Sequence, residues 1–211
     1  MSMSKSLSQK GSKRDRDLDE EKIPFRESRI HLSTTLFLLI GFLISFVPSE
    51  NWLLMTCNVL IALLGGVVLF FFWRIHQYYR AKYYSIVTYV MLNTLAIYFS
   101  IPIIRMTYGT VGFWICIVLL TFLVLFPYIF SELAAGTILK PSESKLGTFF
   151  LIYIVAVVLF GSILYANFQG NDNPNAFALA IFSFLLAIFF FVLAPIVLLK
   201  FEKMTQYRVY K

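Results

Sequence analysis

Residues 52–84 read WLLMTCNVLIALLGGVVLFFFWRIHQYYRAKYY. The stretch carries no charged side chain from Trp52 to Trp73, and it then changes abruptly to a segment rich in arginine, lysine and tyrosine. An α-helix rises about 1.5 Å per residue, so about 20 apolar residues cross the roughly 30 Å hydrocarbon core of a bilayer. The stretch therefore predicts a transmembrane helix that ends in an aromatic and cationic anchor.

The rest of the chain repeats this pattern of long apolar runs and short polar segments. The 211 residues are 59% hydrophobic and 14% charged, with a mean hydropathy of +0.78, whereas soluble domains carry about 25% charged residues. In hydrocarbon every backbone amide must be paired internally, so runs of this kind form helices. We predict an all-α, polytopic membrane protein, a bundle of six transmembrane helices at 32–47, 52–73, 83–104, 110–130, 148–166 and 176–199.

The lysines and arginines are distributed unevenly between the connecting segments. Four alternate segments hold 17 of the 18 basic residues: the N-terminal tail, 74–82, 131–147 and the C-terminal tail. The segments between them hold one, Arg105. Because positively charged segments remain on the cytoplasmic side, we expect both termini to be cytoplasmic. The net charge of +7 then reflects membrane topology, and no nucleic-acid partner is expected.

The charged ends of the chain are assigned to tails. Residues 1–30 are expected to form a disordered cytoplasmic tail, with Ile23, Phe25 and Ile30 near the headgroups. Residues 31–199 form the membrane domain, and residues 200–211 form a basic cytoplasmic tail. A cleaved signal peptide is disfavoured, because the charged region before the first apolar run is long and acidic. We expect a plasma-membrane location and favour a bacterial source, which the lack of an N-x-Ser/Thr sequon permits.

Small and polar residues line one face of several predicted helices. Span 83–104 carries Ser85, Tyr89, Asn93, Ala96 and Ser100 within an arc of about 80°. Comparable stripes are Asn58, Ala62, Gly65 and Gly66 in span 52–73, Ala176, Ala180, Ser183, Ala187 and Ala194 in the last span, and Gly41-x-x-x-Ser45 in the first. Such faces let helix backbones approach closely in lipid.

We expect the groove around Asn58 to receive the stripe of the next helix, with Asn93 also inside the bundle. The two asparagines are either packing residues or the lining of a solute path or partner contact.

The segment from Trp73 to Tyr84 is the densest mixture of aromatic and basic residues in the chain. One interpretation is an aromatic belt with positive anchors. The other is a docking site for anionic lipid headgroups or for an acidic partner, formed by Arg74, Arg80 and Lys82.

No catalytic, cofactor or metal motif accompanies these features. H-E-x-x-H, G-x-S-x-G and Walker A sequences are missing, and no ionisable residue lies mid-span, where proton relays place one. We predict no enzyme, cofactor or metal site, but an accessory or interaction subunit of a larger membrane system. Its expected partners are a bilayer with anionic headgroups at the cytoplasmic face and another membrane protein. The alternative is a small permease subunit or carrier for an uncharged or lipid-like solute, with Asn58 and Asn93 along its path.

Overall fold

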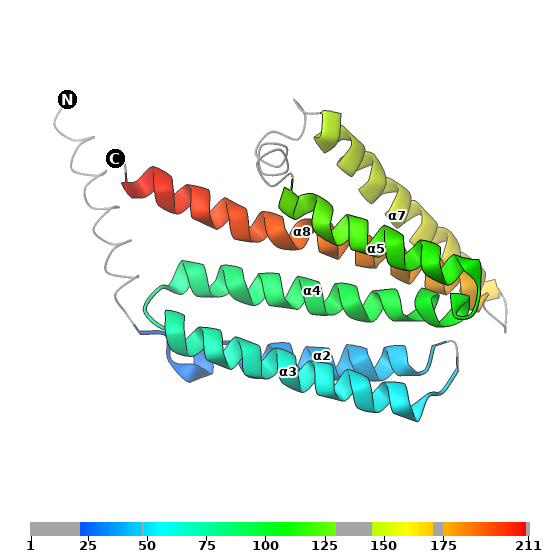
Figure 1. Ribbon diagram of the computed structural model, residues 1–211, viewed down its shortest axis with the longest axis horizontal. Helices are drawn as coiled ribbons and strands as arrows, with labels where there is room; N and C mark the ends of the chain where they lie inside the picture. The colour runs from blue at the N-terminus through cyan, green and yellow to red at the C-terminus, as the bar shows by residue number, and fades with distance from the viewer. Residues whose placement is uncertain (1–21, 48, 130–144, 171–174, 210–211) are drawn as a thin grey trace.

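A computed structural model describes residues 22–47, 49–129, 145–170 and 175–209. These residues form a short 3-10 helix, η1 (Phe25–Glu27), and six α-helices, with no strand among them. The α-helices are α2 (Ile30–Ser45), α3 (Trp52–His76), α4 (Arg80–Thr107), α5 (Val111–Ile129), α7 (Lys145–Gly170) and α8 (Ala176–Val209). Successive helices run in alternating directions (Figure 1). We call the end where α3 finishes and α4 starts the α3–α4 end, and α8 also finishes there (Figure 1).

The predicted all-helical character of the chain is confirmed for the described residues. Four stretches are long and apolar enough to cross a membrane, namely Phe25–Ser45, Trp52–His76, Arg80–Thr107 and Ala176–Pro195. Two further apolar helical segments, Val111–Phe122 and Leu151–Asn167, are shorter. The helices also continue past the predicted apolar runs, and α8 reaches Val209, within the predicted C-terminal tail. Lysine, arginine and glutamate are good helix formers, so an apolar run marks the hydrocarbon boundary and not the end of a helix.

Helix α4 joins two groups of helices. It packs against α2 and α3 on one side and against α8 and α5 on the other, whereas α7 packs against α8 alone among the described helices (Figure 1). One buried cluster holds α2, α3 and α4 together around Phe37, Leu69 and Tyr98. A second joins α4, α5 and α8 around Ile103, Ala180 and Phe184.

The small-residue groove of α3 receives α2, so the prediction that it would receive the stripe of α4 is wrong. A Cβ atom added to Gly66 would lie 2.7 Å from Thr34 Oγ1 of α2, and one added to Gly65 would lie 3.0 Å from the ring of Phe37. Both neighbours of α3 in the chain are joined to it by short connections. Connection length alone therefore did not decide which neighbour entered the groove.

The polar stripe of α4 faces α8 instead. Ser85 Oγ donates a hydrogen bond to the backbone oxygen of Val197 at 3.0 Å, and the ring centroids of Phe99 and Phe190 lie 5.8 Å apart. Four of the five residues on the predicted stripe of α8 are buried, namely Ala180, Ser183, Ala187 and Ala194. Two small-residue faces therefore meet, which allows the close backbone approach expected of helices in lipid.

Arg105, the single basic residue outside the four cation-rich segments, has a structural partner at the opposite end of the molecule. Its Nη1 donates to the backbone oxygen of Val47 at 2.6 Å, and its Nη2 donates to that of Ser49 at 3.1 Å. These carbonyl groups follow the end of α2, where a cation also interacts favourably with the helix dipole. Arg105 therefore ties the connection between α2 and α3 to the end of α4.

Candidate functional site

Residues 22–29, assigned above to the N-terminal tail, pack on the α3–α4 end, and we call them the clasp. Ile23 is only 1% exposed. Its backbone N–H donates to the backbone oxygen of Gln77 at 2.8 Å, and its carbonyl accepts from Trp73 Nε1 at 3.2 Å. These two bonds attach the clasp to the last turn of α3. Residues 1–21 of the predicted tail lie outside the described residues.

The second half of the clasp is attached to the first turn of α4. Tyr83, which is fully buried, donates from its hydroxyl to the backbone oxygen of Ser28 at 2.7 Å. The Tyr84 hydroxyl donates to the backbone oxygen of Glu27 at 2.9 Å. The Glu27 carboxylate forms an ion pair with Arg80. Both groups of this pair are partly exposed, so the pair itself adds little stability, and burial and backbone hydrogen bonds hold the clasp.

Aromatic rings cover the apolar side of the clasp. The Phe25 ring meets the Trp73 ring edge-on, with centroids 5.3 Å apart, and the Phe70 ring at 6.3 Å. Arg29 then turns the chain into α2 with a left-handed backbone, φ 58° and ψ 10°. A non-glycine residue there costs about 1 kcal/mol. The Arg29 guanidinium lies 5.3 Å from the centroid of the Tyr84 ring, a cation–π contact that offsets part of this cost.

The three cationic residues predicted to form a docking site lie at this end of the molecule. Arg74 is exposed in the last turn of α3, and Lys82 is exposed in the first turn of α4. Arg80 already has an internal partner, Glu27. The clasp brings further exposed cations, Lys22, Arg26 and Arg29, to the same end, which was not predicted. The apolar Ile23 and Phe25 inside a charged stretch were the signal that this segment packs.

Asn58 lies at a buried polar junction between α2, α3 and α4. Its side chain is 1% exposed, and its Nδ2 donates to the backbone oxygen of Gly41 at 3.0 Å and to Ser45 Oγ at 2.9 Å. The Tyr98 hydroxyl donates to the Asn58 backbone oxygen at 2.8 Å. The Gly41-x-x-x-Ser45 face therefore serves as the hydrogen-bond acceptor for Asn58. Asn58 Oδ1 finds no partner among the described residues.

Asn93 is not part of this junction. Its Nδ2 donates to the backbone oxygen of Tyr89 in its own helix at 2.9 Å, and the side chain is half-buried. Asn93 shares an arc of α4 with Ser85, which bonds to α8, whereas Asn58 bonds to α2. The expectation that Asn93 would sit against the groove around Asn58 is therefore wrong, since α2 fills that groove.

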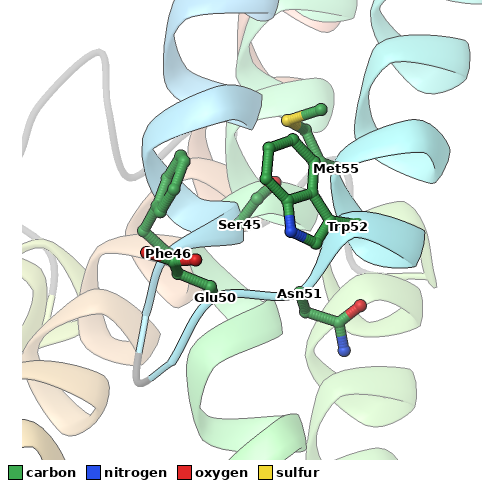
Figure 2. A pocket seen from close by; sticks show the side chains of 6 residues that line it. All are labelled: Ser45, Phe46, Glu50, Asn51, Trp52 and Met55. Carbon is green, nitrogen blue, oxygen red and sulfur yellow. The ribbon is translucent and has the colours of Figure 1, made fainter.

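Two hollows on the described residues include neither Asn58 nor Asn93 in their walls. One lies beside the connection between α2 and α3, where Ser45, Phe46, Glu50, Asn51, Trp52 and Met55 line it (Figure 2). Its cavity volume of about 10 Å³ gives room for about one water molecule. The other is an open, apolar hollow on the outward face of α5, lined by Val111, Trp114, Ile115, Val118, Leu119 and Phe122.

Comparison with protein-family models, curated proteins and solved structures gives no match.

Proposed function

We propose that this chain is a six-span membrane protein with both termini in the cytoplasm, and that it works as a non-enzymatic accessory or interaction subunit of a larger membrane system. Four helices of sufficient length and apolarity, the alternating helix directions (Figure 1) and the uneven distribution of lysine and arginine support the topology. The plasma membrane of a bacterium is the proposed location.

The observation that carries the interaction role is the apolar surface of α5 and α7. Helix α7 packs against α8 alone among the described helices, and one broad face of it exposes large apolar side chains, including Leu151, Ile152, Val155, Val158, Leu159 and Ile163. The outward face of α5 is similarly exposed and is hollowed. Lipid chains cover such surfaces, and a partner helix replaces them where packing is good. We propose that a partner membrane protein packs here.

The hydrogen bonding of the two asparagines supports a packing role over a solute path. The Asn58 amide donates two hydrogen bonds to α2, and the Asn93 amide donates to its own helix. Hydrogen bonds of this kind contribute about 0.6 kcal/mol on average between membrane helices. The carrier for an uncharged or lipid-like solute remains the alternative, and it requires Asn58 to release α2 during transport.

The accessory role predicts a stoichiometric partner. Crosslinking in intact membranes, followed by mild detergent extraction and affinity purification of the full chain, should recover one protein in constant ratio. Val155→Trp on α7 or Ile115→Trp on α5 should lower that recovery at least tenfold, because a bulky ring on the contact face separates the helices. Leu64→Trp, on the exposed face of α3, is the matched control and should retain the partner. Recovery of the crosslinked chain only as a discrete monomer would contradict the proposal.

The proposed topology predicts opposite sides for two reporter positions. A reporter fused after Asn171 should be active only outside the cytoplasm, and one fused after Lys211 only inside it, because the basic segments hold the ends of α5 and α8 and the start of α7 inside. Activity of both fusions on the same side would show that the chain does not cross the membrane once between Asn171 and Lys211, and it would remove the six-span assignment.

A further inference from the structure

The α3–α4 end presents more positive charge than the segment between Trp73 and Tyr84 suggests. Six cationic side chains described there are Lys22, Arg26, Arg29, Arg74, Arg80 and Lys82, and Glu27 is the carboxylate that the structure places among them. The clasp brings its three cations to the same end as the three cations of α3 and α4. It is attached there because Ile23 is hydrogen-bonded to Trp73 and Gln77, and Ser28 to Tyr83.

Most of this charge is open to a ligand. Arg80 is paired with Glu27, and Arg29 lies over the Tyr84 ring. Lys22, Arg26, Arg74 and Lys82 are exposed, and Glu27, the carboxylate described beside them, is paired with Arg80. Exposed cations gathered at one end of the molecule repel one another, and an anionic ligand would lower this cost.

The position of these cations specifies the kind of anion. Directly below them α3 exposes Phe70 and Phe71, side chains suited to hydrocarbon, and Phe25 lies half-exposed against Phe70 and Trp73. Aromatic rings of this kind mark the boundary between hydrocarbon and headgroups. We therefore expect the cations to lie near the depth of the lipid phosphates, and their side chains are exposed.

We propose that the clasp and the α3–α4 end together form a binding surface for the headgroups of anionic phospholipids. Lys22 and Arg26 on the clasp act with Arg74 and Lys82 on the helices. The burial of Ile23 and the backbone hydrogen bonds of the clasp hold the two sets in place, and the Glu27–Arg80 ion pair adds no net charge. The surface rests on the membrane spans of the proposed function, but it is independent of the partner protein. Each basic residue near an anionic surface contributes a few-fold in affinity, so four together enrich anionic lipid locally.

The test measures which lipids lie beside Trp73. The full chain with Trp52→Phe and Trp114→Phe keeps Trp73 as its single tryptophan. It is reconstituted in phosphatidylcholine vesicles that contain a minor, equal fraction of either brominated phosphatidylglycerol or brominated phosphatidylcholine. We expect the brominated anionic lipid to quench Trp73 severalfold more strongly. The affinity for the anionic lipid should fall about tenfold when Arg26→Gln and Arg74→Gln are combined. The stronger quenching by the anionic lipid should also decrease in high salt.

Two controls make the result decisive. A chain with Trp73→Phe and Trp114→Phe reports from Trp52, at the other end of α3, and should show no preference for the anionic lipid. Unchanged quenching by brominated phosphatidylcholine shows that the Gln variants keep their fold and depth. Equal quenching of Trp73 by the two lipids would overturn the proposal, and so would an anionic preference that the double Gln variant retains in full. Neither result would contradict the proposed interaction with a partner protein, because the reconstituted chain is purified without a partner.

Discussion

Gly41→Val is expected to destabilise the protein by about 3 kcal/mol, toward the upper end of the cost of overpacking a well-packed core. A Cβ atom at position 41 would lie 3.1 Å from the Tyr98 ring and hydroxyl and 3.2 Å from Asn58 Cβ. Asn58 Cβ is attached directly to the α3 backbone, so it moves only with the helix. The two methyl groups of valine would therefore separate α2 from α3 and α4, and they would stretch the Asn58 Nδ2 bond to the Gly41 oxygen.

The measurement is the midpoint of thermal unfolding of the detergent-solubilised full chain. Gly41→Ala should give a smaller loss, because alanine adds only the Cβ atom and gains helix propensity over glycine. Gly112→Val is the matched control. There a Cβ atom would meet Thr110 Oγ1 at 3.3 Å and the Thr107 methyl group at 3.5 Å, both ends of short side chains near the start of α5. Equal midpoints for Gly41→Val and Gly112→Val would show that the polar junction is not tightly packed.

The helices were predictable because a long uncharged run has no stable alternative in hydrocarbon. The run from Trp52 to Trp73 specified α3 almost completely. Its extension to His76 was not visible in hydropathy, because Arg74 and His76 are polar residues that continue the helix. The pairing of faces was also not predictable, because several faces have the same small-residue character. Whether the groove at Gly66 receives α2 or α4 depends on matching shapes, such as that of Thr34, and no periodicity specifies the match.

The candidate site was predictable in its position but not in its assembly. Arg74, Arg80 and Lys82 follow an apolar run, which places them at one boundary of the bilayer. The Glu27–Arg80 pair joins residues that are distant in sequence, and nothing in either local segment specifies the partner of the other. The Asn58 junction shows the same division. Asn58 was predicted to be either a packing residue or part of a solute path or partner contact, and Gly41-x-x-x-Ser45 was predicted to be a face for close helix approach. Neither prediction gave their hydrogen bonds, which depend on the register between α2 and α3.

Ile23→Ala is expected to release the clasp and to raise its rate of cleavage by trypsin about 30-fold or more. Truncating a fully buried isoleucine costs about 2–5 kcal/mol, and each 1.4 kcal/mol is a factor of about ten in an equilibrium. Ile23 is the most deeply buried side chain of the clasp after Ser28, and its backbone carries both bonds to α3. When local opening is fast relative to cleavage, the cleavage rate follows the population of the open form.

The readout is the mass of the long C-terminal fragments that begin after Arg26 or Arg29, followed over time. Ile75→Ala is the matched control, since Ile75 lies near the same end of α3 but is 53% exposed, and its fragments should appear at the wild-type rate. Loss of the clasp should also remove the carbonyl partner of Trp73 Nε1, so Trp73 emission should shift to the red in the single-tryptophan chain. If both alanine variants are cut at one rate and the emission stays in place, burial of Ile23 does not hold the clasp. The cations at positions 22 and 26 would then have no fixed place beside Arg74 and Lys82. Anionic lipid would in that case have to be bound by the helices alone, which the comparison of Ile23→Ala with the wild type in the quenching assay would measure directly.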